Sequence, residues 1–116
     1  MRWGVDGSSI PVYLRGVQLE RIAWVGGHAP REDDLRRRLE DEGFSVWVWT
    51  DPPDAAYVAH AHDHDESLWV VRGAITFGVD GATYRLEVGD RLMLPRATVH
   101  TAEAGPSGAT YLIGER

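Results

Sequence analysis

The chain has 116 residues, 43% of them apolar and 26% charged, with a formal net charge of −6. This length accommodates one domain with a hydrophobic core, and the composition excludes an intrinsically disordered chain. The net negative charge excludes a nucleic-acid-binding protein, because the one arginine cluster, at residues 36–38, is surrounded by acidic residues.

Several absences limit the location and the chemistry that we expect. No apolar run approaches the roughly 18 to 20 residues of a membrane span, and residues 1–7 lack the apolar core of a signal peptide, so we expect a cytoplasmic protein. The sequence has no cysteine and no lysine, which excludes thiolate metal sites and a lysine Schiff base. Histidine, carboxylate, hydroxyl and arginine side chains remain for any reaction.

The N-terminal third is predicted to hold an arm, a strand and one helix. Residues 10–14 contain a proline, which strands tolerate mainly at sheet edges, so we interpret them as an edge strand or an arm that pairs with a second subunit. Residues 17–25 are a predicted strand that ends at two glycines. Residues 30–42 are a predicted helix, because Pro30 suits the first turn, acidic residues follow it and Gly43 favours a C-terminal stop. The narrow apolar stripe of this helix places it on the surface.

From residue 44 onward, β-branched and aromatic runs alternate with turn signals, which is typical of strands. The pair Asp80-Gly81 between apolar flanks predicts a two-residue hairpin, and residues 105–108 predict a further turn. The expected strands are residues 44–50, 55–62, 68–72, 74–79, 82–86, 91–94, 99–104 and 109–113. About eight short strands at regular spacing predict a closed barrel or a sandwich.

Three histidines and a glutamate alternate between residues 60 and 66. His60 and His62 point to the same face of a strand, because alternate side chains of a strand share a face. His64 and Glu66 have the same parity, but the intervening aspartates indicate a turn. We therefore predict a hairpin in which one strand carries His60 and His62 and the next begins with Glu66. Imidazoles and a carboxylate form a ligand set for zinc, iron, nickel, copper or manganese.

Two spacing patterns surround these residues. In the first, His60, His62, Glu66 and Gly73 follow the order His-x-His, three residues, glutamate, six residues and glycine, and Asp54 lies six positions before His60.

The second pattern is glycine, five residues, Pro-x-Gly, two residues, histidine, three residues and asparagine. Gly89, Pro95 and His100 match it, whereas Ala97 and Ala104 replace the second glycine and the asparagine. Ala97 would be strained in the positive-φ conformations that are open to glycine. Together the two patterns resemble the two motifs of the cupin superfamily, in which the first motif usually begins with a glycine at the place of Asp54.

This resemblance implies an all-β cupin double-stranded β-helix, a jelly-roll-like barrel, with one N-terminal α-helix. Residues 1–43 would form an N-terminal arm, strand and surface helix packed on a barrel of residues 44–116, in one structural domain. The resemblance further implies one divalent metal ion, with zinc, iron, manganese, nickel and copper left open. Its implied ligands are His60, His62, Glu66 and His100. The alternative is a metal-free cupin whose barrel histidines are satisfied by hydrogen bonds.

Two further histidines are interpreted separately. A rival pairing would use His62 and His64 as the His-x-His pair, but Glu66 would then follow too closely to cross a turn. We therefore expect His64 to be a turn or pocket-mouth residue, exposed to solvent rather than bound to metal, with proton transfer as a lesser alternative. His28 is expected in a surface loop.

Two functions stay open at this point. The first is a small metalloenzyme with dioxygenase- or isomerase-like chemistry on a small oxygenated molecule, and the second is a non-catalytic cupin that binds or senses a small ligand or a metal. No catalytic residue is assigned, although His64, Tyr84 and Arg91 are candidates for an acid or a base. The resemblance also implies a homodimer. The net charge and the lack of a long apolar run predict no nucleic-acid and no membrane partner.

Overall fold

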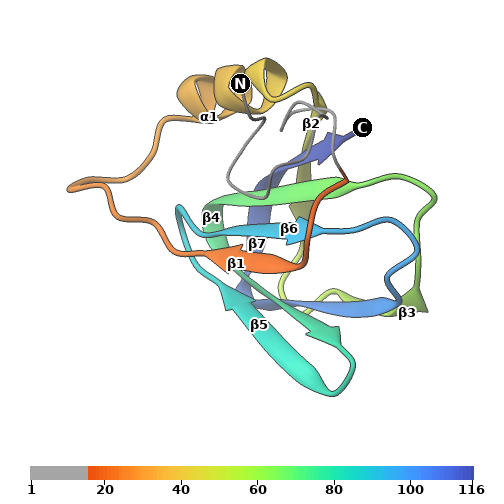
Figure 1. Ribbon diagram of the computed structural model, residues 1–116. Coiled ribbons are helices and arrows are strands. Elements are labelled where there is room, and N and C mark those ends of the chain that lie inside the picture. The colour runs from red at the N-terminus through yellow and green to blue at the C-terminus, as the bar shows by residue number, and fades with distance from the viewer. Residues whose placement is uncertain (1–15) are drawn as a thin grey trace, which may run out of the picture.

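The computed structural model of the protein describes residues 16–116, in which it has one helix and seven strands (Figure 1). The predicted arm at residues 10–14 lies outside the described residues. The elements in chain order are β1 (Glu20–Ile22), α1 (Glu32–Asp41), β2 (Ser45–Asp51), β3 (Ala56–His60), β4 (Glu66–Val79), β5 (Ala82–Leu86), β6 (Arg91–Leu94) and β7 (His100–Glu115). No helix in this part of the chain is long and apolar enough to cross a membrane.

Two long strands, β4 and β7, organise the sheet and pair with each other in the antiparallel direction. The first part of β4 pairs with β6 and its last part with β5, while β7 pairs with β3 near its start and with β2 near its end. Each long strand therefore belongs to both halves of a bent sheet, which Figure 1 shows folded around a common interior. The predicted all-β fold with one N-terminal helix is confirmed.

The strand count differs from the prediction because two predicted breaks are bulges. Residues 68–72 and 74–79 belong to the single strand β4, and the predicted turn at residues 105–108 lies inside β7. The pairing register between β4 and β7 shifts here, so the extra residues of β7 bulge without ending the strand. Gly73 and Gly108 have φ angles of 73° and 79°, a left-handed conformation that lets each strand bend and continue.

The first predicted strand is shorter than expected. Of residues 17–25, only Glu20–Ile22 form a strand, because the partner strand β6 has just four residues. Hydrogen bonds to the carboxylate of Asp90, and not further strand pairing, fix the residues around β1. This carboxylate accepts hydrogen bonds from the Arg21 guanidinium at 2.9 Å and from the Trp24 backbone N–H at 3.0 Å.

Two hydrophobic cores lie on opposite faces of the central strands, because side chains alternate along a strand. Helix α1 covers the outer core, which contains Leu35, Leu39, Phe44, Trp69 and Leu112. The inner core contains Leu68, Val70, Ile75, Phe77, Val79, Leu86, Leu92, Leu94, Ala102, Ala104, Ala109 and Tyr111. Glu66 shares the parity of Leu68 and therefore faces the interior of the barrel.

Candidate metal centre

The four predicted metal ligands come from three strands and one loop. His60 is the last residue of β3 and pairs directly with His100, the first residue of β7. Glu66 begins β4, and His62 lies in the loop between β3 and β4, where its carbonyl accepts a hydrogen bond from the Ala97 N–H at 2.7 Å. The prediction that one strand carries both His60 and His62 is wrong, because β3 ends at His60 and a hydrogen-bonded loop presents His62.

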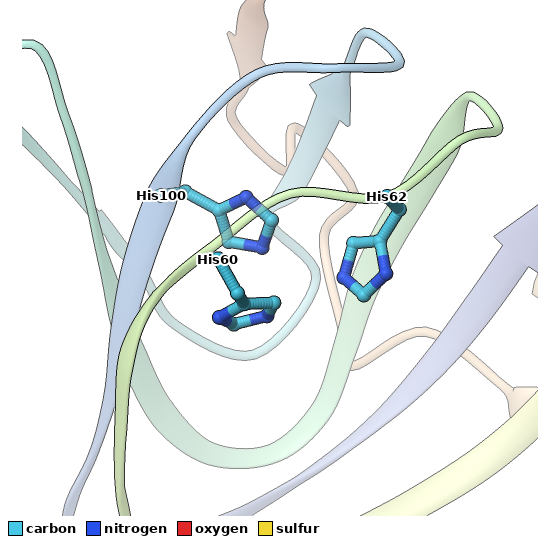
Figure 2. A group of neighbouring side chains, drawn as sticks. All are labelled: His60, His62 and His100. Atoms are coloured by element: carbon cyan, nitrogen blue, oxygen red, sulfur yellow. The ribbon is translucent and has the colours of Figure 1, made fainter.

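The imidazoles of His60, His62 and His100 gather at one place (Figure 2). Their ring centroids are separated by 4.4 Å for His60 and His100, 5.0 Å for His60 and His62, and 5.3 Å for His62 and His100. One potential ligand atom from each residue lies within 4.8 Å of those of the other two. Three imidazole nitrogens are therefore close enough to serve one ion.

Backbone carbonyls orient two of these rings. His60 Nδ1 lies 2.6 Å from the carbonyl oxygen of Val58, and His100 Nδ1 lies 2.9 Å from that of Thr98. Because a carbonyl can only accept a hydrogen bond, each Nδ1 carries the proton and each Nε2 keeps its lone pair for a metal. Sequence reasoning missed these two carbonyls, since backbone acceptors have no signature in residue type.

Glu66 completes a donor set that fits a divalent cation. Its side chain is buried, with Oε1 3.6 Å from His62 Nε2 and Oε2 3.3 Å from His64 Nε2. Among the described residues, the ion-pair partners of Glu66 are histidines only. Positive charge stabilises a buried carboxylate, and a divalent ion held by three neutral imidazoles would add positive charge beside Glu66. The residues present therefore fit a first-row divalent metal.

The environment of His100 keeps it in the form that binds metal. Burial lowers the pKa of His100, and repulsion from His60 and His62 in their protonated forms lowers it further, whereas its hydrogen bond to Thr98 and the charge of Glu66 act in the opposite direction. The net shift is downward from the usual value. His100 is thus a neutral imidazole at neutral pH, as a metal ligand must be.

His64 is less exposed than predicted, because its side chain retains only 26% of its accessible surface. Its Nε2 lies 3.3 Å from Glu66 and 3.1 Å from Glu115, and it forms a second possible metal-binding group with His62 and Glu66. The argument that Glu66 follows too closely is therefore wrong, since the short loop folds back on itself. Burial lowers the pKa of His64, but hydrogen bonds to Glu66 and Asp63 and the charge of Glu115 raise it above its usual value.

A pocket of about 270 Å³ opens beside the three histidines and Glu66. Aromatic and aliphatic side chains form most of its wall: Trp49, Tyr57, Leu68, Phe77, Ala102, Tyr111 and Ile113. Phe77 and Tyr111, which belong to the inner core, both line this pocket. A mostly apolar wall with a few polar groups is typical of a small-molecule site.

Asp51 underlies this pocket and is the residue that sequence reasoning missed. It is 2% exposed, and its carboxylate accepts hydrogen bonds from Trp49 Nε1 at 2.9 Å, from the Tyr111 hydroxyl at 2.8 Å and from the Tyr57 hydroxyl. Its position before two prolines indicated only a chain break. The available signal was its parity with Trp49, which places both side chains on one face of β2.

A protein-family model described as a cupin domain matches residues 47–112. The chain belongs to the cupin family. This match confirms the resemblance drawn from the two motifs. No curated protein matches the chain.

Solved structures similar to this cupin include three bacterial proteins. An RmlC-like cupin from Shewanella frigidimarina is 26% identical, with a TM-score of 0.56, over 62% of this chain and 64% of that one. KdgF from Halomonas sp. is 29% identical, with a TM-score of 0.53, over 63% of this chain and 70% of that one. DMSP lyase DddQ from Ruegeria pomeroyi is 23% identical, with a TM-score of 0.58, over 63% of this chain and 38% of that one, and shows the fold alone. The match thus spans less than two thirds of the Shewanella protein and of DddQ.

Two of the residues considered as an acid or a base lie away from the pocket of this cupin. Arg91 is buried on the outer face, where it donates to Ser67 at 2.7 Å, pairs with Glu42 and lies 4.5 Å from the ring centroid of Trp69. These contacts attach the end of α1 to the barrel. Tyr84 is a partly buried residue of β5 that packs against the inner core and is not among the described residues that line the pocket. His28 is exposed, as predicted.

Proposed function

We propose that this cupin binds one divalent metal ion through His60, His62, His100 and Glu66 and holds a small oxygenated molecule in the adjoining pocket. The observation that carries the proposal is the convergence of three imidazoles beside a buried carboxylate at the edge of an apolar pocket. A bound ion would supply Lewis-acid or oxygen-activating chemistry to that molecule.

The residues of the chain have distinct tasks in this proposal. The Val58 and Thr98 carbonyls keep two imidazoles in the tautomer that exposes Nε2. Glu66 contributes negative charge that offsets the positive charge of the ion. The aromatic and aliphatic wall limits the access of water to the bound molecule.

The proposed activity is dioxygenase- or isomerase-like. The similar structures include proteins as different as KdgF and DMSP lyase DddQ, so likeness of fold does not select a reaction. A non-catalytic role in binding or sensing a small ligand is the second candidate. One observation favours this second role. The hydroxyls of Tyr57 and Tyr111 both donate their hydrogen bonds to Asp51 and are not free to donate to a substrate. Of the predicted acid or base candidates, His64 is therefore the one left near the pocket. Oxygen uptake or isomerisation by the metal-loaded protein would select the catalytic role.

Elemental analysis of the untagged protein by inductively coupled plasma mass spectrometry tests the metal site. We expect about one divalent ion per chain in the wild type and in the His28→Ala control, which changes an exposed loop histidine. His100→Ala is expected to lose most of the metal, because it removes a buried ligand. His64→Ala is expected to keep the stoichiometry.

The opposite pattern would identify the other group of possible ligands. If His64→Ala loses the metal and His100→Ala retains it, then His62, His64 and Glu66 form the site instead. If the wild type binds no ion after reconstitution with each candidate metal, the histidines serve a metal-free cupin and the proposal is wrong.

We further propose that the protein is a homodimer that uses the exposed strand β2. Among the described residues β2 pairs only with β7, and it exposes Trp47 by 53% and Val48 by 39%. A free strand edge with apolar side chains can pair with a second copy about a twofold axis. Light scattering coupled to size-exclusion chromatography should give twice the chain mass, and Val48→Glu should give the monomer. A monomeric wild type at micromolar concentration would contradict the proposal.

A further inference from the structure

We propose that the aromatic wall of the pocket recognises a hydrogen-bond-donating group of the bound molecule, a hydroxyl or a protonated amine, and discriminates against carboxylates and phosphates. This inference names the substrate class of the proposed metal site and rests on that proposal for the function of the pocket. The wall in question consists of Trp49, Tyr57 and Tyr111, whose side chains donate to Asp51.

Asp51 engages every proton that this part of the wall can donate. Trp49 Nε1, the Tyr57 hydroxyl and the Tyr111 hydroxyl each carry one hydrogen that can form a hydrogen bond, and all three are directed to the Asp51 carboxylate. Trp49 Nε1 also lies 3.2 Å from the Tyr57 oxygen, so its hydrogen is shared between two acceptors. The lone pairs of the tyrosine oxygens remain for a ligand, and lone pairs can only accept.

The protons stay in these bonds at neutral pH. The hydrogen bond to Asp51 and burial raise the pKa of Tyr57, and burial and the hydrogen bond to Asp51 raise the pKa of Tyr111. Asp51 is 2% exposed and has no arginine among its hydrogen-bond partners in residues 16–116. Two neutral hydroxyls that donate to one carboxylate therefore form a stable arrangement that presents acceptors to the pocket.

The charged side chains around the pocket also disfavour an anionic ligand. Glu66 and Glu115 line it, and His64, which lies between these two carboxylates, is outside the lining. No arginine lines the pocket among the described residues, and the sequence has no lysine. At the proposed metal centre, Nδ1 of His60 and Nδ1 of His100 each donate a hydrogen bond to a backbone carbonyl, so these two N–H groups do not point at a ligand. A carboxylate or phosphate beside the aromatic wall would thus meet acceptors and negative charge, and would lose its hydrogen bonds to water without replacement.

The remaining wall is apolar and determines the other part of the molecule. Leu68, Phe77 and Ile113 line the pocket between the acceptor groups. They suit an aliphatic or aromatic body, because burial of apolar surface is favourable and these side chains offer no polar group. The expected ligand therefore combines a small apolar body with a hydroxyl or ammonium group.

Three probes with the same ring test the inference: benzyl alcohol, benzylamine and benzoate, titrated by calorimetry at neutral pH. In metal-free protein we expect benzyl alcohol or benzylamine to bind at least about tenfold more tightly than benzoate, which corresponds to one unpaired acceptor contact. The alcohol and amine titrations distinguish the hydroxyl from the ammonium. Equal or tighter binding of benzoate, or no binding of any probe, would contradict the inference.

The metal-free titration also separates this inference from the proposed function. The aromatic wall does not require the ion. If the protein binds no metal but prefers benzyl alcohol or benzylamine to benzoate, the metal site is refuted and this inference about the wall is supported. If the protein binds metal but prefers benzoate in the metal-free state, the metal site is supported and the inference about the wall is refuted. Benzoate is compared without metal because a carboxylate can bind the ion directly.

Variants identify the residues responsible. Asp51→Asn keeps the shape but gives the wall an amide donor and frees tyrosine protons, so the preference against benzoate should fall to within about threefold. Because Asp51 is buried, Tyr57→Phe provides a second test at a side chain that is 37% exposed. It removes one of the two donors to Asp51 Oδ1, because Trp49 Nε1 still donates to that oxygen, and should strengthen benzylamine relative to benzyl alcohol. Tyr84→Phe, outside the pocket lining, is the control and should change nothing. Unchanged preferences in both folded test variants would overturn the assignment.

Discussion

Two positions that usually carry glycine in the cupin motifs hold other residues here, and the backbone nevertheless keeps the glycine conformation. Asp54 has a φ of 61° and Ala97 a φ of 62°. Aspartate tolerates this left-handed region better than most residues, whereas alanine has no side-chain polar group to compensate. Ala97 is held there while its N–H donates to the His62 carbonyl at 2.7 Å. The strained residue is therefore the one whose N–H positions a proposed ligand.

Ala97→Gly should raise the free energy of unfolding by about 0.5 to 1 kcal/mol, because glycine adopts positive φ without steric cost. Ala59→Gly in the exposed part of β3 is the matched control and should lower it by about the same amount, since glycine weakens a strand interior. Urea denaturation measures both. A loss of stability in Ala97→Gly comparable to that of the control would show that Ala97 is unstrained.

The raised pKa values of the two tyrosines that donate to Asp51 predict a loss of stability in alkali. The pKa values of Tyr57 and Tyr111 are raised in the folded protein, so the unfolded chain loses these protons first. The resulting stability is complete below the usual tyrosine value of about 10 and is lost as the pH rises above it. Tyr111→Phe should make the fall of unfolding free energy above about pH 10 shallower, by up to about 1.4 kcal/mol per pH unit. Denaturation at a series of pH values measures this slope, and an unchanged slope would contradict the assignment.

At the scale of the elements, each of the long strands β4 and β7 has a glycine where a neighbouring backbone lies close, Gly73 against β7 and Gly108 against the end of β2. A Cβ added at Gly73 would lie 2.1 Å from the carbonyl oxygen of Gly108, and one added at Gly108 would lie 2.6 Å from that of Asp51. These contacts lie at the shift in register between β4 and β7. The bend that separates the two halves of the sheet, and with it the end of the pocket near Asp51, therefore depends on the absence of side chains here.

Gly73→Ala tests this close approach, with Gly81→Ala as its control. Both glycines have positive φ, 73° and 78°, but a Cβ at Gly81 would meet nothing within 4 Å. Gly81→Ala should therefore cost only the conformational penalty of about 1 kcal/mol, whereas Gly73→Ala should cost about 3 kcal/mol or more. Chemical denaturation measures the difference. Equal losses in the two variants would show that the backbone moves apart without cost.

At the scale of the whole molecule, the proposed metal centre joins parts of the chain that are far apart in sequence. His60 and Glu66 flank one loop, while His100 begins β7, and β7 pairs with β4, β2 and β3. An ion held by these residues would connect strands from both halves of the bent sheet. Since the unfolded chain cannot assemble this ligand set, metal binding should stabilise the whole fold.

Saturation of the protein with its metal should therefore raise its thermal midpoint. At about 100 times the dissociation constant the gain is about 2.7 kcal/mol, which corresponds to roughly 10 °C for a domain of this size. Differential scanning calorimetry with and without EDTA measures the shift. His100→Ala is the control and should show little response to metal. An equal response in the variant would place the stabilising ion elsewhere.

The sequence alone determined the features that depend on residue type and short spacing. The hairpin at Asp80-Gly81, the helix, the two cupin motifs and the convergence of His60, His62 and His100 all followed from local pattern or from resemblance. These features are readable because turn residues, helix ends and strand parity act over only a few positions. The ligand role of the histidines stays a prediction until an ion is measured.

Only the tertiary structure decided which distant residues meet. Asp51 and Tyr111 are 60 positions apart, and the register between β2 and β7 brings them within 2.8 Å. The placement of His64 against Glu115 likewise depends on a loop that folds back over the end of β7. Strand pairing over such separations is set by the summed burial of two whole faces and by bulges, and no single residue encodes it.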